Sequence, residues 1–194
     1  MEKSTRKYEA IVIGTSAGGL TALHRVFSQL DEKFRLPILI VQHVSPNYES
    51  RLPVLLSQYG TGLVREAEDK DQVREGNVYI SPPNYHLLVE PDKSLALSVQ
   101  DRVNLSRPSI DVLFETASEA YCESLVGIIL TGTTSDGANG LSTIQKRCGL
   151  TIVQSPESAE FDIMPRAALA ASSPDFILPL NEIGLFMNSL SNRG

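Results

Sequence analysis

The chain has 194 residues and a formal net charge of −6, from 17 Lys and Arg against 23 Asp and Glu. Apolar residues make up 42% of the chain and charged residues 21%, which is typical of a globular domain and excludes general disorder. No apolar run approaches the ~18 residues that span a bilayer, and no Lys/Arg-rich stretch offers a phosphate-binding stripe. We therefore expect no membrane insertion and no nucleic-acid partner.

The cysteines argue against a disulfide framework and against a zinc site. Cys122 and Cys148 lack CxxC spacing and have no neighbouring histidine. The first ten residues lack the apolar stretch of a signal peptide. We therefore expect a cytoplasmic protein without a structural zinc site, and a single domain over residues 1–194.

Strands and helices are predicted to alternate in the first sixty residues. Continuous apolar runs at 8–14 and 36–41 are typical of strands buried on both faces. Apolar residues at helical spacing predict a helix over 18–30, and a second helix is expected over 48–59. This alternation predicts an α/β fold, with a doubly wound, mostly parallel sheet flanked by helices.

The segment 61–102 has a different pattern. Short extended runs are separated there by the turn-rich stretches EDKDQVREG, SPPNY and PDKS. Tight turns between short strands favour hairpins, so we predict an antiparallel hairpin insertion or sheet extension. The expected strands cover 63–68, 77–81, 86–90 and 95–100.

Alternation of helix and strand resumes after residue 105. A helix is predicted to open at 106–108, with Pro108 in its first turn, and to bury Ile110, Leu113, Phe114 and Ala117. Gly149 is expected to cap the next helix. The predicted helices cover 106–121, 136–148, 165–171 and 182–190, and the predicted strands 124–130, 151–154 and 176–178.

Three loops are expected to meet at one edge of this sheet. Ligand sites of parallel sheets lie at the carboxyl ends of the strands. The loops after the strands at 8–14, 36–41 and 124–130 carry Ser16, His43 and Asp136. A hydroxyl, an imidazole and a carboxylate are the chemical types of a nucleophile, its base and the group that orients the base.

The loop that carries Ser16 reads GTSAGG and fits G-x-S-x-G between a strand and a helix. A serine there lies beside a helix amino terminus, which favours developing negative charge. Two other interpretations stay open. Ser16 could only cap the helix, or the loop could cradle a phosphate, although G-x-G-x-x-G fails at position 16 and no Lys follows Gly18-Gly19.

His43 is the best placed of the three histidines, because it ends a predicted parallel strand. His24 lies within the first helix, and His86 begins a strand in the insertion, where a packed structural role is favoured. Asp136 has two compatible roles: it can cap the following helix, or it can orient His43. The chain order Ser, His, Asp differs from that of α/β-hydrolases.

Several separated motifs resemble the catalytic domain of the bacterial chemotaxis-receptor methylesterases. They are IVIGTSAGGLTAL, LPILIVQHVSP, VYISPPNYHLLVE, RPSIDVLFETAS, LTGTTSDGANG and MPRAALA, and they cover nearly the whole chain in order. The resemblance implies a serine esterase that hydrolyses γ-glutamyl methyl esters on receptor helices and releases methanol, often with glutamine deamidation. It places the nucleophile on Ser16, the histidine on His43 and the aspartate on Asp136.

The chain departs from the family pattern in two respects. Many members carry an amino-terminal receiver domain, whereas this chain begins almost at its first strand, so it is expected to be a fragment or a stand-alone enzyme. Well-known members read TGMG where this chain has Thr131-Gly132-Thr133-Thr134. The family's oxyanion site implies backbone N–H donors at Ala17 and Thr133.

An acidic enzyme acting on glutamate-rich receptor helices needs local positive charge. Arg51, Arg107 and Arg166 are the candidate substrate-binding residues, and Arg166 in MPRAA is favoured because its loop follows a strand at the catalytic edge. A surface ion pair is the alternative role for each arginine.

Two alternative functions remain at this point. The first is a binding module for a nucleotide or phosphate, with Ser16 as a helix cap. The second keeps the hydrolase chemistry but changes the substrate to a small ester or amide.

Overall fold

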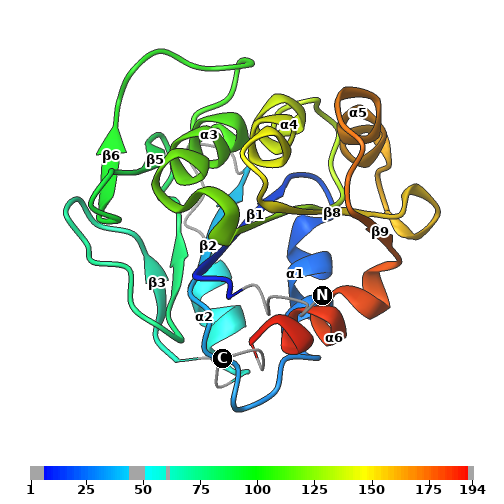
Figure 1. Ribbon diagram of the computed structural model, residues 1–194, viewed down its shortest axis with the longest axis horizontal. Coiled ribbons are helices and arrows are strands. Elements are labelled where there is room, and N and C mark those ends of the chain that lie inside the picture. Colours follow the sequence, from blue (N-terminus) through cyan, green and yellow to red (C-terminus); the bar gives the residue numbers. More distant parts are fainter. Residues whose placement is uncertain (1–6, 44–50, 60–61, 192–194) are drawn as a thin grey trace, which may run out of the picture.

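The computed structural model describes residues 7–43, 51–59 and 62–191. A parallel sheet of seven strands runs through the molecule (Figure 1). Its strands, from one edge to the other, are β3 (Val64–Glu66), β4 (Val78–Ile80), β2 (Ile38–Gln42), β1 (Ala10–Thr15), β7 (Leu125–Ile129), β8 (Leu150–Gln154) and β9 (Phe176–Leu178). From β1 the chain winds outward to β3, returns to β7 on the other side of β1, and winds outward to β9. This order confirms the predicted doubly wound α/β fold.

Helices cover both faces of this sheet (Figure 1). One face carries α1 (Gly19–Phe27), α2 (Leu52–Ser57) and α6 (Leu180–Ser191), and the other carries α3 (Ile110–Tyr121), α4 (Ala138–Lys146) and α5 (Ile163–Ala171). Two short 3₁₀ turns, Cys122–Ser124 and Pro156–Ser158, precede β7 and α5.

The core lies on both sides of the central strands. In β1, Ile11 and Ile13 pack towards α1 and α6, whereas Ala10 and Val12 pack towards α3 and α4. Because both faces of the strand are covered, apolar residues follow one another without alternation. The predicted inner face of α3 is confirmed, since its apolar residues Ile110, Leu113, Phe114 and Ala117 are buried.

The antiparallel part of residues 61–102 is smaller than predicted. β3 and β4 belong to the main sheet, where Val78 pairs in parallel with Ile38 of β2 and with Val64 of β3. Only β5 (His86–Val89) and β6 (Leu95–Ser98) form an antiparallel hairpin, in a separate two-stranded sheet. A short extended run does not reveal which strand it pairs with, so the prediction extended the hairpin pattern too far.

Two predicted helix ends also need correction. The helix after β6 begins at Ile110 and not at 106–108, because Ser109 is still extended, with φ −111° and ψ 137°. After α4 the left-handed residue is Cys148, with φ +64°, and not Gly149. A Cβ on Gly149 would lie 2.6 Å from Ile144 Cγ2, so this glycine serves close packing. Residues 48–50 of the predicted helix 48–59 lie outside the described residues.

Candidate active site

Three loops at the carboxyl edge of the sheet carry the candidate catalytic residues. Ser16 follows β1, His43 follows β2, and Asp136 lies in the loop between β7 and α4. β1 lies between β2 and β7, so these loops are neighbours. The winding reverses between β1 and β7, which is where parallel sheets place their ligand sites.

Hydrogen bonds join the Ser16 loop to the end of β2. The Gln42 side-chain amide donates to the carbonyl oxygens of Ser16, at 2.8 Å, and of His43, at 2.9 Å. The His43 backbone N–H donates to Thr15 O at 3.0 Å. The backbones of Ser16 and His43 are therefore fixed side by side.

The two glycines after Ser16 are required by the shape of this turn. Gly18 is the N-cap of α1 and has φ +76°, which favours glycine. A Cβ on Gly19 would lie only 2.0 Å from Gln42 Oε1, so a side chain there would displace the amide that joins the two loops. No side chain caps α1, which excludes the interpretation of Ser16 as its cap.

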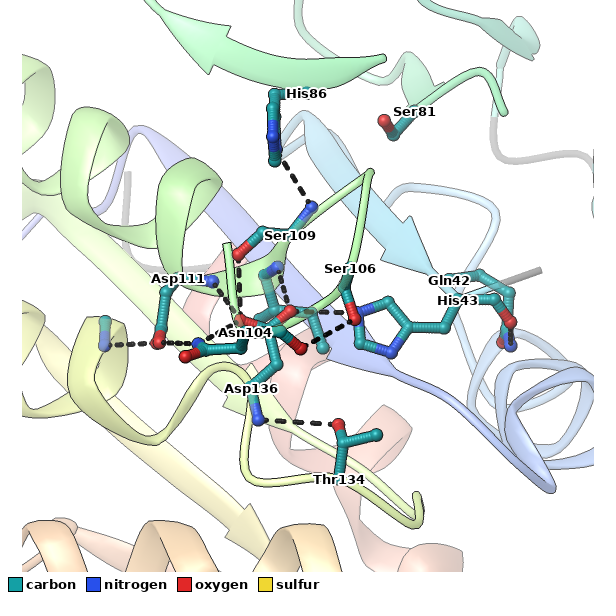
Figure 2. A network of polar contacts seen from close by, with 12 residues as sticks. Gln42, His43, Ser81, His86, Asn104, Ser106, Ser109, Asp111, Thr134 and Asp136 are labelled. Carbon is teal, nitrogen blue, oxygen red and sulfur yellow. Dashed lines mark hydrogen bonds and ion pairs between the residues drawn. The ribbon is translucent and has the colours of Figure 1, made fainter. Parts of the chain in front are cut away.

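His43 and Asp136 form a direct pair, 2.9 Å from Nε2 to Oδ2 (Figure 2). The Asp136 side chain is completely buried, and that of His43 is 13% exposed. Because an ionised carboxylate can only accept a hydrogen bond, His43 donates its Nε2–H to Asp136. This leaves Nδ1 as the ring nitrogen that can take a proton. Among the described residues, no hydrogen bond joins the Ser16 hydroxyl to this ring.

Asp136 caps a helix, but not the helix predicted from the sequence. The N-cap of α4 is Gly137, without a side-chain bond. The Asp136 carboxylate instead accepts the backbone N–H groups of Ile110, at 2.6 Å, and Asp111, at 3.3 Å, at the start of α3. It also accepts the Ser109 hydroxyl at 2.8 Å. The positive end of α3 therefore faces the carboxylate.

These contacts keep Asp136 ionised. Burial by itself raises the pKa of Asp136, but hydrogen bonds from His43, Asn104, Ile110 N–H and Ser109 outweigh it, so the pKa lies below its ordinary value. The folded state therefore holds the proton less tightly than the unfolded chain. The resulting stabilisation is present above the unfolded pKa and is lost as the pH falls through the lower folded-state pKa.

The two predicted oxyanion donors lie in loops next to Ser16. A Cβ on Gly132 would lie 3.0 Å from Ser16 Cβ, so the loop after β7 packs directly against the serine. The Gly132 N–H donates to Phe161 O at 3.0 Å. Within the part of the chain that the structure describes, the N–H groups of Ala17 and Thr133 donate no hydrogen bond.

The candidate substrate-binding arginines have different surroundings. Arg166 is 63% exposed on α5 and pairs with Asp162 at 2.6 Å. Arg107 donates through Nη1 to the carbonyls of Val99 and Gln100, at 2.7 and 3.0 Å. Arg51 is exposed at the N-cap of α2. Among the described residues, none of these arginines forms a hydrogen bond or ion pair with Ser16 or Asp136.

Sequence analysis missed the side chains that hold the site together. Asn104, Ser109 and Asp111 surround Asp136 (Figure 2). Thr131 Oγ1 bonds the carbonyl oxygens of Ala17 and Phe161 and so joins their two loops. The sequence feature that could have indicated these residues is the run of polar residues before α3, but such a run is typical of any loop. His86 is buried and bonded at both ring nitrogens, to Asp101 O and Ser109 N–H, as expected for a structural histidine.

The described ranges contain neither a metal-binding cluster nor a membrane-spanning helix. No group of three or more His, Cys, Asp or Glu side chains there is arranged to hold a metal ion. None of the helices there combines the length and apolar character needed to cross a bilayer.

Comparisons with known proteins agree on one family. The family model of the CheB methylesterases matches residues 11–187. A putative protein-glutamate methylesterase/protein-glutamine glutaminase of Leptospira interrogans is 48% identical over 191 residues, covering 96% of this chain and 99% of that protein. The protein-glutamate methylesterase FrzG of Myxococcus xanthus is 37% identical over 177 residues, covering 91% of this chain and 53% of that protein.

A solved structure shows the same fold. The CheB methylesterase catalytic domain of Thermotoga maritima superposes with a TM-score of 0.89 at 30% identity, covering 95% of this chain and 99% of that one. The family match, the high identity to relatives and the shared fold lead to one conclusion: the chain belongs to the CheB methylesterase family.

Proposed function

We propose that this protein is a cytoplasmic protein-glutamate methylesterase, which removes methyl esters from glutamate side chains of chemotaxis receptors and also deamidates receptor glutamines. The observation that carries the proposal is the pair of His43 and Asp136, 2.9 Å apart, at the sheet edge where Ser16 follows β1. Residues 1–194 act in this proposal as one catalytic domain. Its chemistry needs no metal or organic cofactor.

The arrangement supports a two-step hydrolysis. His43 Nδ1 takes the Ser16 proton as Oγ attacks the ester carbonyl, and Asp136 stabilises the imidazolium through Nε2–H. The proton then passes to the leaving methanol, or to ammonia when the substrate is glutamine. Water attacks the acyl-enzyme by the same route and releases the glutamate.

The negative charge of the tetrahedral intermediates needs donors in place before reaction. The backbone N–H groups of Ala17 and Thr133, which donate no hydrogen bond within the described ranges, are the donors in this proposal, each worth about 3 kcal/mol in the transition state. Thr133 stands where the family pattern has Met. The donor is the backbone N–H of this residue, so the change of side chain does not remove it.

Methanol release from a methylated receptor fragment tests the proposal. We expect the purified protein to release methanol in proportion to the methyl ester supplied, and none from the unmethylated fragment. Absence of methanol release together with hydrolysis of small esters would favour the small-ester alternative. Micromolar binding of mononucleotides without any hydrolysis would favour the phosphate-binding alternative.

Arg166 is proposed to guide the acidic receptor helix to the site. It lies on α5, whose Met164 N–H donates to Gly132 O in the catalytic loop. We expect Arg166→Ala to lower kcat/KM for the methylated receptor about fivefold, mostly at low salt, and to leave a small neutral ester nearly unaffected.

Arg147→Ala is the matched control, because it also removes one positive charge and breaks an exposed pair, with Glu119 at 3.1 Å, beyond the last turn of α4. Equal losses on both substrates for Arg166→Ala would assign the residue to the fold. An effect no larger than that of Arg147→Ala would assign it to the general surface.

A further inference from the structure

The turn that precedes α3 places an asparagine next to the candidate catalytic carboxylate. Val103 and Ser106 exchange backbone hydrogen bonds of 3.2 and 2.8 Å. The two residues between them, Asn104 and Leu105, have φ values of +51° and +63°. Hairpin turns of type I′ need positive φ at both central positions, where asparagine is common. The turn explains the backbone of Asn104 but not the direction of its side chain.

The side chain of Asn104 bonds two buried carboxylates at once. Its Nδ2 group donates to Asp136 Oδ1 at 3.0 Å and to Asp111 Oδ2 at 2.8 Å (Figure 2). Asp136 is fully buried and Asp111 is 3% exposed. An amide NH₂ group has two hydrogens, so both are used.

Two neighbouring buried carboxylates repel each other unless donors lie between them. Burial, and then the charge of Asp136, raise the pKa of Asp111. The other Asp111 oxygen accepts Gly140 N–H at 2.7 Å. Asn104 is the side chain that supplies a hydrogen to each carboxylate, so its removal would leave Asp136 with fewer donors and the same neighbouring carboxyl.

The bond from Asn104 also restricts how the Asp136 carboxylate can rotate. Asn104 and Ser109 bond Oδ1, whereas His43 and Ile110 N–H bond Oδ2. Figure 2 shows Asn104 and His43 on opposite sides of the carboxylate. Holding Oδ1 on one side keeps Oδ2 directed at His43 Nε2.

We propose that Asn104 is a positioning residue: its side-chain amide, presented by the turn at 103–106, fixes Asp136 in the orientation that holds His43. The inference rests on the proposed function. It concerns the imidazole's hydrogen bond and not the substrate.

Asn104→Gly removes the side-chain amide but keeps the turn, because glycine adopts positive φ without steric strain. We expect kcat for methanol release to fall about tenfold, with KM within about twofold, which corresponds to one charge-assisted hydrogen bond. Leu105→Gly is the matched control at the other central position of the turn. It is expected to keep kcat, because it changes no side-chain donor.

Asn104→Asp keeps the size of the side chain but replaces the donor with a third carboxylate. Repulsion then favours the protonated form of Asp136, so its pKa rises. We expect a larger loss of kcat than in Asn104→Gly, and an acidic limb of the pH–kcat/KM profile displaced to higher pH. Should Asn104→Gly fail to fold, this displacement carries the test.

A substrate-free measurement separates this inference from the proposed function. In ¹H–¹⁵N spectra we expect the His43 Nε2–H proton of the wild type and of Leu105→Gly to be downfield and protected from exchange. In Asn104→Gly it should move upfield or broaden. If the wild type releases no methanol, the proposed function fails, and this spectrum still decides the role of Asn104.

The inference is overturned by an unchanged His43 signal in Asn104→Gly, even if kcat falls. It is overturned equally by wild-type kcat in that variant, or by the same losses in Leu105→Gly, which would make the turn's conformation the cause. A loss confined to the Asn104 variants, together with a changed His43 signal, supports it.

Discussion

Ser16→Ala is expected to lower kcat for methanol release by about 10⁴-fold or more, the largest effect of any single substitution in this protein. Without Oγ no acyl-enzyme can form, and the rate that remains comes from the oxyanion donors and from substrate binding. KM should change little, because the hydroxyl that is removed makes no hydrogen bond to another described residue. The measurement is single-turnover methanol release from methylated receptor.

Ser189→Ala provides the control for this experiment. Ser189 lies on α6, and its hydroxyl donates to Phe186 O in the same helix. We expect Ser189→Ala to keep the wild-type kcat. Both Ser189→Ala and Ser16→Ala should melt within a few degrees of the wild type. Turnover of Ser16→Ala within tenfold of the wild type would place the nucleophile elsewhere.

The parallel core of the fold could be predicted from sequence because its signals are local. Continuous apolar runs such as 8–14 and 36–41 specify strands covered on both faces, and β1 and β2 are buried in that way. The carboxyl ends of parallel strands share one edge of the sheet. That rule alone selected the loops of Ser16, His43 and Asp136.

The parts that could not be predicted depend on contacts between distant segments. The pairing of β4 with β2 joins residues 40 positions apart, as in Ile38 with Val78. Asn104 contacts Asp136, 32 positions later in the chain. A run of polar residues before a helix reads as a loop, and nothing local indicates that its side chains turn inward.

Helix capping shows the same limit. An aspartate just before a helical segment normally caps that segment, and Asp136 precedes α4 in this way. In the structure Gly137 is the N-cap of α4, and Asp136 caps α3 from another part of the chain. The sequence predicted that Asp136 caps a helix, but the identity of that helix could only come from the tertiary structure.

In the proposed mechanism, the hydrogen bond between His43 Nε2 and Asp136 determines which tautomer of His43 is active. Because His43 Nε2–H donates to Asp136, the unprotonated Nδ1 is the nitrogen that would take the Ser16 proton. In the serine proteases the two nitrogens have the opposite roles. The same chemistry is possible either way, since only the relation of carboxylate, ring and hydroxyl matters.

Asp136→Asn should therefore lower kcat by about 10³- to 10⁴-fold. An amide NH₂ group facing His43 donates to Nε2 and stabilises the tautomer that carries its proton on Nδ1. That tautomer cannot accept the Ser16 proton. The amide oxygen, at the Oδ1 position, can still accept the Ser109 hydroxyl and Asp111 N–H. Ile110 N–H loses its acceptor, which lowers stability, but the loop keeps its other bonds, so the loss of activity should appear in kcat and not in KM.

Stability measured against pH provides a second readout of the same variant. The wild-type carboxylate has a lowered pKa and stabilises the fold above the unfolded pKa of about 3.9. The difference in melting temperature between the wild type and Asp136→Asn should thus be largest near neutral pH. It should shrink as the pH falls through the lower folded-state pKa of Asp136.

Asp175→Asn is the matched control for Asp136→Asn, because Asp175 accepts the backbone N–H and the hydroxyl of Thr151, each at 2.8 Å, at the start of β8. Its loss should lower stability but leave kcat unchanged, since Thr151 lies at the opposite end of β8 from the catalytic loops. If Asp136→Asn lowered stability in the same way and kept kcat within tenfold, Asp136 would act as the cap of α3 alone. A selective loss of kcat means instead that the carboxylate that caps α3 also holds His43 in its active tautomer.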